Sequence, residues 1–347
     1  SFEYSSLGGW VATKSSGQQS LGYGRMDDLF RGGLLHTPRG SLRIPDHPAS
    51  AAGPGTGDMV LGSEGRMGIL SRATVQVRPL PEVEHFHGFF LPNWDIAESA
   101  VRNLVQSELP LSMLRLSNPQ ETRAQLALSG KVRMSDYMLK YLRLRGMDTG
   151  SACMLLVGFT GSGARIKQSK REVIPWLKRR FQAVHLHRFL GDSWARNRFQ
   201  APYLRNTLWD EGYAVDTLET AVTWDRIARI MPAIEEALEQ GLQEEGEGVH
   251  AFSHLSHFYP TGASVYTTYI FRIAPDPQET RRRWQKLKDA ASRAIVQNRG
   301  TISHHHGVGM DHKEYLRAEK GELGISAIKG LCEHFDPQGI MNPGKLV

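Results

Sequence analysis

The sequence has little cysteine and no long apolar run. Its 347 residues include two cysteines, Cys153 and Cys332, which lie far apart and form no CxxC pair. A disulfide framework and a thiolate metal cluster are therefore disfavoured, and a reducing compartment fits best. No apolar stretch approaches the length of a membrane span, and the run from Ala152 to Phe159 is better explained as a buried strand. We therefore expect a soluble protein.

Standard nucleotide-binding motifs are also missing. No Gly-Lys-Ser or Gly-Lys-Thr follows a glycine-rich loop, and no GxGxxG connects a strand to a helix, which disfavours a Walker site and a nicotinamide Rossmann domain. The net charge of +6 and the pI near 9.3 favour anionic ligands. The densest basic run, Arg281 to Arg283 with Lys286 and Lys288, is expected on the solvated face of a helix and does not indicate nucleic acid.

Three adjacent histidines followed by glycines are the most informative feature that is present. The run from Ser303 to Gly309 places three imidazoles beside a backbone that can approach a flat ligand closely. In an extended segment, His304 and His306 would share one side and His305 the other. Structural zinc is disfavoured, because adjacent histidines do not reproduce its separated ligand spacing. A reactive site is thus predicted, with a solvated polar loop as the alternative.

Composition divides the chain into three regions, at residues 1–85, 86–275 and 276–347. The first is rich in glycine and turns, so helices are almost excluded there. The second mixes amphipathic helices with strands that alternate as in an antiparallel sheet with one buried face. The third contains a long helix, the histidine run and a final helix. The predicted fold class is α+β.

Caps, periodicity and turns predict the individual elements. A helix follows a cap at Asn93, and Gly300 is expected to end the long helix from Pro277 in the left-handed conformation. The acidic segment 241–248 is predicted to be a surface loop. The other expected helices are 168–181, 223–241 and 323–335. The expected strands are 73–78, 85–90, 152–159, 183–189 and 264–272.

The turn from Gly62 to Gly68 is a second candidate binding element. Its glycines allow backbone N–H groups to converge on one point, as in nests that hold phosphate or pyrophosphate. A turn without any ligand explains the same residues equally well. The pairing of this turn with the distant histidine run makes a family resemblance visible.

Six segments, in this order along the chain, carry the resemblance: Gly8 to Thr13, Thr37 to Gly40, Gly62 to Ile69, Arg78 to Glu82, Ser303 to Gly309 and Asp336 to Asn342. They resemble the vanillyl-alcohol-oxidase (PCMH) type of FAD-binding flavoproteins across essentially the whole chain. Within that family they are most similar to the alkyldihydroxyacetonephosphate synthases. The related D-lactate and glycolate dehydrogenases typically carry Glu-His-Gly where this chain has its histidine run.

The resemblance implies FAD as cofactor, bound in a two-part α+β domain and covered by a cap domain whose antiparallel sheet is flanked by helices. Residues 1–85 would form the second part of the FAD-binding domain, and the first part, with its pyrophosphate-binding loop, is expected to be missing from this chain. Residues 86–275 would form the cap or substrate domain. Residues 276–347 would supply C-terminal helices and a His-rich strand that closes on the flavin.

The resemblance also implies roles for individual residues. Tyr259 matches the catalytic acid/base tyrosine, although the segment before it is about two residues shorter, and a buried core tyrosine is the alternative. Proton transfer is assigned to Tyr259 and to one of His304, His305 and His306. Backbone shape is the alternative for the implied cofactor-binding residues, which are Ser15, Ser16, Gly17, Gly62, Ser63, Glu64, Gly65, Gly68 and Ile69.

Two arginines match substrate-binding positions. Arg205 matches an arginine that reaches the anionic end of the substrate, and Arg115 matches one that the synthases need for activity; a planar guanidinium holds phosphate with two hydrogen bonds. A salt bridge between domains is the alternative for Arg115. His254 and His257 could support Tyr259 or bind metal, but the resemblance implies no metal. Met310 stands where the synthases often have a lysine.

The implied reaction replaces the acyl group of acyl-dihydroxyacetone phosphate by a fatty alcohol, with capture of the substrate carbon by flavin N5 and no net redox change. One alternative is an FAD-dependent dehydrogenase or oxidase of an alcohol or a 2-hydroxy acid such as D-lactate or glycolate. Another is a truncated binding module without FAD. The expected partner is an anionic lipid-like or hydroxy-acid substrate. Cytoplasm is the expected location, because Lys345 to Val347 is no peroxisomal signal, and membrane contact and a homodimer are left open.

Overall fold

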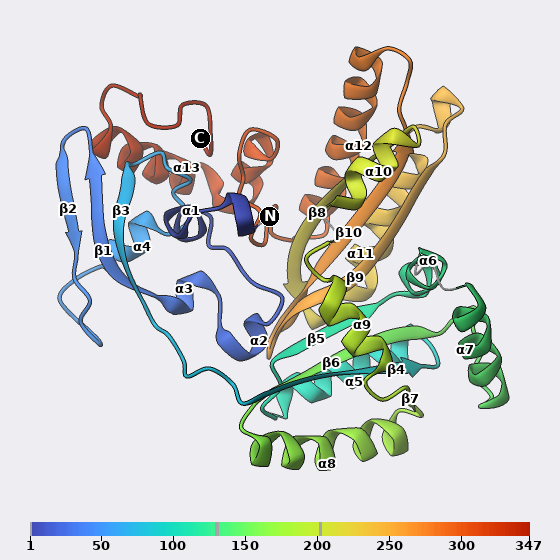
Figure 1. The fold of residues 1–347 in the computed structure, drawn as a ribbon. Coiled ribbons are helices and arrows are strands. Elements are labelled where there is room, and N and C mark those ends of the chain that lie inside the picture. The colour runs from blue at the N-terminus through green and yellow to red at the C-terminus, as the bar shows by residue number, and fades with distance from the viewer. Residues whose placement is uncertain (1, 108, 129–131, 201–202) are drawn as a thin grey trace. The chain divides into compact units, whose positions relative to one another are not determined.

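A computed structural model gives the fold (Figure 1). It describes residues 2–107, 109–128, 132–200 and 203–347. Contacts divide the chain into two compact units. The first, which we call the glycine-rich unit, consists of residues 1–17, 24–79 and 292–347. The second, which we call the sheet unit, consists of residues 18–23 and 80–291. The domain limits expected at residues 85 and 275 stay predictions.

The glycine-rich unit contains a small antiparallel sheet with strand order β2-β1-β3. Its core brings together apolar residues that are far apart in the sequence, including Val11, Leu35, Val60, Met67 and Cys332. The strands are β1 (Phe30–Thr37), β2 (Gly40–Ile44) and β3 (Ile69–Val75). The helices are η1 (Phe2–Tyr4), α1 (Leu7–Ala12), α3 (Met26–Leu29), α4 (Thr56–Val60), η4 (Lys313–Tyr315) and α13 (Leu316–Phe335).

Almost no helices were expected in this glycine-rich region. Short helices form there, so that expectation was wrong. The first of them, α1, begins after Ser6, whose hydroxyl accepts the N–H of Gly9 at 3.1 Å. This cap satisfies one of the otherwise free N–H groups of a helix that contains two glycines. The strand expected at 73–78 also begins earlier than predicted, because β3 starts at Ile69 and ends at Val75.

The histidine run is bent, which corrects the prediction of a His-rich strand. Residues 304–306 form consecutive bends, and the backbone then passes through left-handed φ angles of +83° at Gly307 and +58° at Gly309. Just before the run, the left-handed residue is Arg299, with φ +57°, and not Gly300. Local alternation therefore does not decide where the three imidazoles point.

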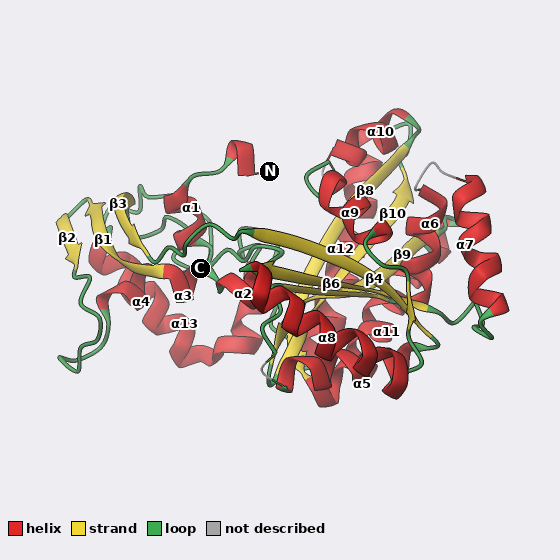
Figure 2. Cartoon of the chain, turned by 60° about the horizontal axis from the view of Figure 1, so that its bottom comes forward, coloured by secondary structure: helices red, strands yellow, loops and turns green. Residues whose placement is uncertain are grey.

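The sheet unit is built on an antiparallel sheet with strand order β7-β4-β6-β5-β9-β10-β8. In Figure 2, helices α5, α8 and α11 lie on one side of this sheet and α9 and α10 lie on the other. The strands are β4 (Val83–Leu91), β5 (Met113–Ser117), β6 (Cys153–Gly161), β7 (Val184–His185), β8 (Tyr213–Thr223), β9 (Val249–Tyr259) and β10 (Gly262–Arg272). The helices are α2 (Ser20–Tyr23), α5 (Trp94–Gln106), α6 (Pro119–Leu128), α7 (Val132–Leu144), α8 (Gly163–Arg180), α9 (Phe189–Asn197), α10 (Leu204–Asp210), α11 (Trp224–Gln240), η3 (Gln243–Glu245) and most of α12 (Pro277–Gln297).

Most elements predicted for this unit are confirmed. The Asn93 side chain caps α5 by accepting the N–H of Ile96 at 3.0 Å, and the predicted apolar face of that helix is buried. The strand expected at 183–189 is reduced to the two residues of β7, because His187 has a left-handed φ of +49° and α9 begins soon after it. The α+β fold class is therefore correct.

The basic run on α12 is not entirely a solvated face. Lys288 is buried, and its ammonium group donates to Asp216 at 2.9 Å and to the carbonyl of Thr217 at 3.0 Å. Arg282 and Lys286, in contrast, pair with acidic residues of the loop that was expected at 241–248. None of the described helices combines the length and apolar character that a bilayer-spanning segment requires.

Candidate active site

The turn at residues 62–68 is attached to the C-terminal end of α1. The N–H of Gly62 donates to the carbonyl of Val11 at 3.3 Å, and the N–H of Glu64 donates to the carbonyl of Ala12 at 2.9 Å. The N–H groups of Ser63 and Arg66 also donate to backbone carbonyls. These four donors are used inside the protein, which contradicts their expected convergence on a phosphate.

A nest does form, but it lies after the histidine run and holds a side chain of the protein. Gly307 and Gly309, both with positive φ, flank Val308. The N–H groups of Val308 and Gly309 donate to the two carboxylate oxygens of Glu64, the second at 2.8 Å. The carbonyl of Glu64 in turn accepts the side-chain amide of Asn342 at 2.6 Å. Glu64 thus joins the turn, the histidine run and the C-terminal segment.

The three histidines of the run form a chain from the interior to the surface. His304 is buried, His305 is half-buried and His306 is exposed. Nδ1 of His304 lies 3.0 Å from Nδ1 of His305, and the rings of His305 and His306 are 4.5 Å apart. Arg25 approaches the inner end, with Nη1 3.5 Å from Nε2 of His304. Such a chain can carry a proton between solvent and a buried group.

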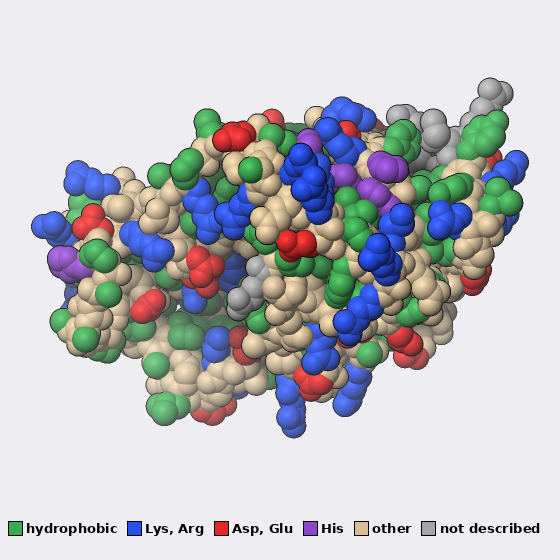
Figure 3. Space-filling view, turned by 90° about the horizontal axis from the view of Figure 1, so that it is seen from below, with side chains coloured by type: hydrophobic (Ala, Val, Ile, Leu, Met, Phe, Trp, Pro, Cys, Tyr) green, Lys and Arg blue, Asp and Glu red, His purple; other side chains and the backbone are tan. Residues whose placement is uncertain are grey.

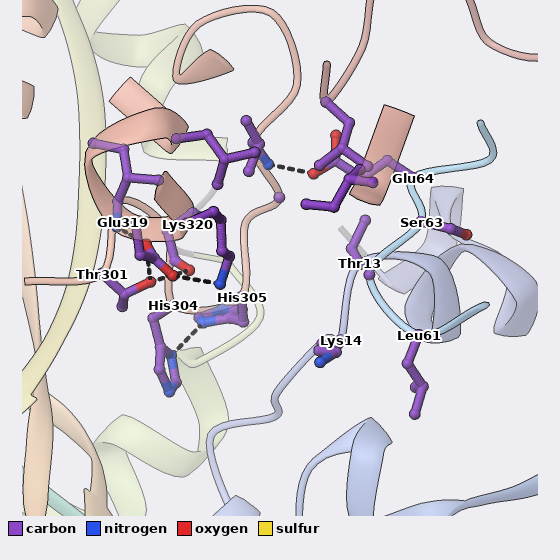
Figure 4. Close-up of a pocket in the computed structure, with 18 of the residues that line it drawn as sticks. Thr13, Lys14, Leu61, Ser63, Glu64, Thr301, His304, His305, Glu319 and Lys320 are labelled. Atoms are coloured by element: carbon purple, nitrogen blue, oxygen red, sulfur yellow. Dashed lines mark hydrogen bonds and ion pairs between the residues drawn. The ribbon is translucent and has the colours of Figure 1, made fainter. Parts of the chain in front are cut away.

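Two cavities of the glycine-rich unit adjoin this chain. One, of about 260 Å³, is lined by Thr13, Lys14 and Ser63 on one side and by Thr301, His304 and His305 on the other (Figure 4). The second, of about 460 Å³, is lined by Gly65, Gly68, Ile69 and His306 among others. The second volume falls within the range of roughly 300–1,000 Å³ that is typical of small-molecule sites.

Residues of the cavities fit part of a flavin nucleotide. Lys14 offers a cation for an anionic ring edge or phosphate, and its aliphatic chain lies over Gly62. The hydroxyl of Ser303 is buried in the wall and has no hydrogen-bond partner among the described residues, which a polar ligand group would supply. Ile69 is 65% exposed and offers apolar contact. Ser15, Ser16 and Gly17 do not line either cavity.

The sheet unit carries a polar face made by neighbouring strands. A register shift in the pairing of β9 with β10 places both Ser256 and His257 opposite Ser264. As a result, both side chains approach Glu219 of β8: the Ser256 hydroxyl donates at 3.0 Å, and Nε2 of His257 lies 3.7 Å away. His254 stacks on Tyr266 on the same face, with ring centroids 4.8 Å apart.

Arg115 is fixed by a buried carboxylate at one end of this face. Nη2 of Arg115 donates to Oε1 of Glu121 at 2.7 Å, and Nδ1 of His254 lies 2.9 Å from the same oxygen. Burial raises the pKa of Glu121, but the neighbouring Arg115 and His254 outweigh burial and hold that pKa below its usual range. Burial and Arg115 together lower the pKa of His254. The salt bridge that Arg115 forms with Glu121 thus lies within the sheet unit, whereas the alternative expected for Arg115 was a bridge between domains.

The structure brings Tyr259 and Arg115 to one face of the sheet, and Arg205 belongs to helix α10. Tyr259 pairs with Gly262, which pairs with Thr223, four residues from Glu219, so Tyr259 lies on the polar face. It is half-buried. Arg205 is exposed on α10. The substrate-binding role of Arg205 stays a prediction.

Three residues of these sites escaped the sequence analysis. Glu219 carried no clear signal, because Leu218 and Val222 set the apolar alternation of β8 and Glu219 falls between them, on the other face of the strand. Glu121 had no signal either, since it lies in the first turn of α6, where an acidic residue is ordinary. Lys14 follows α1 with a left-handed φ of +51°, which sequence does not indicate.

Comparisons with known proteins show which family this chain resembles. The family model described as FAD linked oxidases, C-terminal domain, matches residues 80–346. The chain is 31% identical to an alkyldihydroxyacetonephosphate synthase of Dictyostelium discoideum and 28% identical to one of Trypanosoma brucei brucei, in each case over 100% of this chain and 57% of the relative. A probable mitochondrial D-lactate dehydrogenase of Danio rerio is 25% identical over 99% of this chain and 65% of its own length.

A solved structure of alkyldihydroxyacetonephosphate synthase superposes with a TM-score of 0.77 at 27% identity, covering 99% of this chain and 58% of that one. The chain therefore spans somewhat more than half the length of the synthases that it matches. The family match extends over well more than half of the chain and includes the polar face and the histidine run. By these matches, the chain belongs to the FAD-linked oxidase family and contains its C-terminal domain.

Proposed function

We propose that the protein to which this chain belongs binds FAD and exchanges the acyl group of acyl-dihydroxyacetone phosphate for a fatty alcohol. The observation that carries the proposal is the match to synthases along the whole chain at 28–31% identity, including both the turn at 62–68 and the histidine run. The dehydrogenase match is weaker, at 25% identity. When bound, FAD would supply the ring that takes up electron density from the substrate carbon.

Residues of the glycine-rich unit would hold the cofactor and move protons. Lys14 and the hydroxyl of Ser303 would contact polar groups of FAD from the wall of the smaller cavity, and Ile69 would contact an apolar surface in the larger one. The chain from exposed His306 through His305 to buried His304 would relay a proton between solvent and the reacting centre. Glu64 would keep this relay in place by holding the backbone that follows it.

Residues of the sheet unit would act on the substrate. Tyr259 would remove or return a proton at the substrate carbon, since the residue lies on the polar face of the sheet. Arg205, which is exposed to solvent, would bind the phosphate through its planar guanidinium. Arg115 would present the remaining donors of its guanidinium to the same anionic substrate while Glu121 fixes one of them.

A second candidate function is oxidation of a 2-hydroxy acid by the same residues, with the similarity to the probable D-lactate dehydrogenase in its favour. The two functions differ in electron balance. Oxidation of a hydroxy acid leaves the cofactor reduced, whereas acyl exchange leaves it in its starting state. A carboxylate and a phosphate both suit Arg205, so binding alone does not separate the candidates.

The test is to purify the full-length protein and record its visible spectrum under anaerobic conditions. With acyl-dihydroxyacetone phosphate and a fatty alcohol, we expect release of fatty acid, formation of the alkyl product and a spectrum that ends oxidised. Lasting bleaching by a 2-hydroxy acid would favour the dehydrogenase instead. A protein without flavin absorbance, even after incubation with FAD, would overturn both enzyme functions and favour a binding module.

Variants assign the roles within that assay. Tyr259→Phe should lower the rate of exchange by roughly 10²–10⁴-fold while leaving flavin binding intact, because only the proton-transfer hydroxyl is lost. Tyr213→Phe, on β8 and 38% exposed, is the matched control and should retain the rate. Equal rates for the two variants would remove Tyr259 from the mechanism.

A further inference from the structure

A cluster of four histidines lies in the sheet unit, away from the polar face that carries Tyr259. His85 and His87 belong to β4, and His185 and His187 form a second His-x-His pair at β7. The antiparallel pairing of Phe89 with His185 brings the two pairs together, because the side chains of alternate residues share one face of a strand. Leu186 and Gly88 continue the contact through a backbone hydrogen bond of 2.9 Å.

The imidazoles of this cluster touch one another. Nδ1 of His87 lies 2.9 Å from Nε2 of His185. The ring of His187 follows, with its centroid 4.5 Å from that of His185. Phe89 stacks on His185 at 4.6 Å and Phe159 meets His87 edge-on at 5.5 Å, so aromatic rings fix the pair. His87 is buried, His185 is half-buried and His187 is exposed, which leaves one side open to solvent.

Protein hydrogen bonds do not satisfy this cluster completely. Nε2 of His87 is buried and has no hydrogen-bond partner among the described residues. Nδ1 of His87 and Nε2 of His185 can share only one proton at 2.9 Å, so at least one of these two nitrogens offers a lone pair that a metal ion can bind.

We propose that His87 and His185, joined by His187 as a third ligand, bind one divalent transition-metal ion such as zinc or nickel. Two imidazole nitrogens bound at about 2.1 Å in tetrahedral geometry lie about 3.4 Å apart, so the pair at 2.9 Å needs to open by only about 0.5 Å. One ring moves its proton to its other nitrogen as the metal enters. His187 is exposed and can rotate toward the pair, and water completes the coordination.

The ligand set determines which metal is expected. Three imidazoles without a carboxylate suit zinc, nickel or copper and do not suit calcium or magnesium, which prefer oxygen. His85 is excluded from the set, because the ammonium group of Lys170 lies 3.1 Å from its Nδ1. Lys170 and Arg188 place positive charge near the cluster, and Asp192, in a salt bridge with Arg188, offsets part of it.

These nearby charges predict moderate affinity for the metal ion and a large drop in that affinity when one histidine ligand is removed. His187 is exposed, and Figure 3 shows surface histidine side chains close to lysine and arginine side chains. The nearby cations oppose a dication, so we expect nickel or zinc to bind less tightly here than at a structural zinc site. The site does not depend on the proposed FAD function, since its residues contribute nothing to that mechanism.

Metal binding to the purified full-length protein tests the proposal. After treatment with a chelator, titration calorimetry with zinc and with nickel should show one more bound equivalent in the wild type than in His87→Ala/His185→Gln, or an affinity lower by at least about tenfold in the double variant. His250→Gln, which removes an exposed histidine of β9, is the matched control and should bind as the wild type does. Equal stoichiometry and affinity in all three proteins would overturn the proposal.

Crystals of the wild type make the test independent of how the variant folds. After soaking in zinc chloride, anomalous scattering should place an ion within bonding distance of Nδ1 of His87 and Nε2 of His185. An ion bound only at the histidine run at 304–306, with the pair still at its hydrogen-bonded distance, would show that the pair is a structural contact. That outcome would also overturn the proposal.

Discussion

The carboxylate of Glu64 accepts the backbone N–H of Gly309 at 2.8 Å, although 245 positions separate the two residues in the chain. The same carboxylate also accepts the N–H of Val308. A turn near the beginning of the sequence thereby determines the backbone path just after the three histidines. Glu64 belongs to the segment that the family resemblance implies for cofactor binding, and its side chain holds the loop that borders the smaller cavity.

Loss of this carboxylate should loosen the histidine run. Glu64→Ala removes two charge-assisted hydrogen bonds and leaves two N–H groups of the loop without their acceptor, so we expect a loss of about 1–3 kcal/mol in the free energy of unfolding, together with weaker retention of FAD. Glu64→Gln, which keeps one acceptor oxygen, should lose less. Urea denaturation and flavin content after gel filtration measure the two effects.

The matched control for the two Glu64 variants is Glu314→Ala, which removes an exposed carboxylate of the same unit. It should leave both stability and flavin content within experimental error of the wild type. If Glu64→Ala behaves like this control, the two backbone hydrogen bonds contribute nothing measurable and the loop is held by other contacts.

Substitution of Gly68 should destabilise the protein for a steric reason. A Cβ at this position would lie 2.3 Å from the carbonyl oxygen of His36, and the backbone φ is +154°. Gly68→Ala should therefore lower the free energy of unfolding by about 3 kcal/mol or more, because a backbone carbonyl of β1 would have to move. Thermal denaturation of the two proteins measures the loss.

Gly53→Ala separates backbone strain from this collision. Gly53 also has a positive φ, of +77°, but a Cβ there would meet nothing within 4 Å. It should cost only about 1–2 kcal/mol, the penalty of a left-handed conformation for a residue with a side chain. Equal losses for the two variants would mean that the glycine at position 68 is needed for its φ angle alone.

Elements with strong local signals were predictable. The cap at Asn93 with its apolar face predicted α5, the apolar run at 152–159 predicted β6, and apolar alternation predicted β4 and β10. The failures have different causes. The bend at the histidine run depends on Glu64, which lies far away in the sequence. The short β7 follows from the left-handed φ of His187 and the start of α9 at Phe189, which apolar alternation alone does not indicate.

The candidate site divides in the same way. Motifs identified the turn, the histidines and Tyr259, and the family match agrees with the resemblance that they carry. Motifs could not identify the residues with which charged side chains form ion pairs. Lys288 was expected in solvent and is buried against Asp216, and Arg115 is held by Glu121, because pairing of charges follows from tertiary structure.

Glu235 predicts a dependence of stability on pH. Burial raises the pKa of this carboxyl on α11 to about 7, although Asn118 donates a hydrogen bond of 2.7 Å to it. Between the ordinary glutamate pKa and pH 7 the folded protein keeps a proton that the unfolded chain has released, so stability falls as pH rises through this window. The full cost, about 3 kcal/mol, is present above pH 7.

Glu235→Gln removes that ionisation and keeps an oxygen that can accept from Asn118. It should therefore raise the free energy of unfolding by about 1–3 kcal/mol at pH 8 and by much less at pH 5. Glu236→Gln, at the next and exposed position of the same helix, should show no such difference between the two pH values. Chemical denaturation at both pH values measures this difference. An equal gain in the free energy of unfolding at pH 5 and pH 8 would exclude the ionisation of Glu235 as its cause.

Arg115 and Glu121 allow structural and catalytic roles to be separated. The pKa of Glu121 is depressed in the folded protein, so its ion pair stabilises the fold above the ordinary glutamate pKa and that contribution is lost as pH falls through the folded value. Arg115→Met leaves a buried carboxylate without its cation and should cost about 3–5 kcal/mol at pH 7. Arg123→Met, an exposed arginine on the same helix as Glu121, is the control.

The double variant Arg115→Met/Glu121→Gln then decides what the arginine does. It removes the buried charge along with its partner, so it should recover much of the lost stability. If Arg115 also binds the anionic substrate, catalytic turnover stays low in this stable protein and KM rises, because the substrate has lost its cation. If turnover returns together with stability, Arg115 serves only to neutralise Glu121, and the anionic end of the substrate must depend on another cation, for which Arg205 is the remaining prediction.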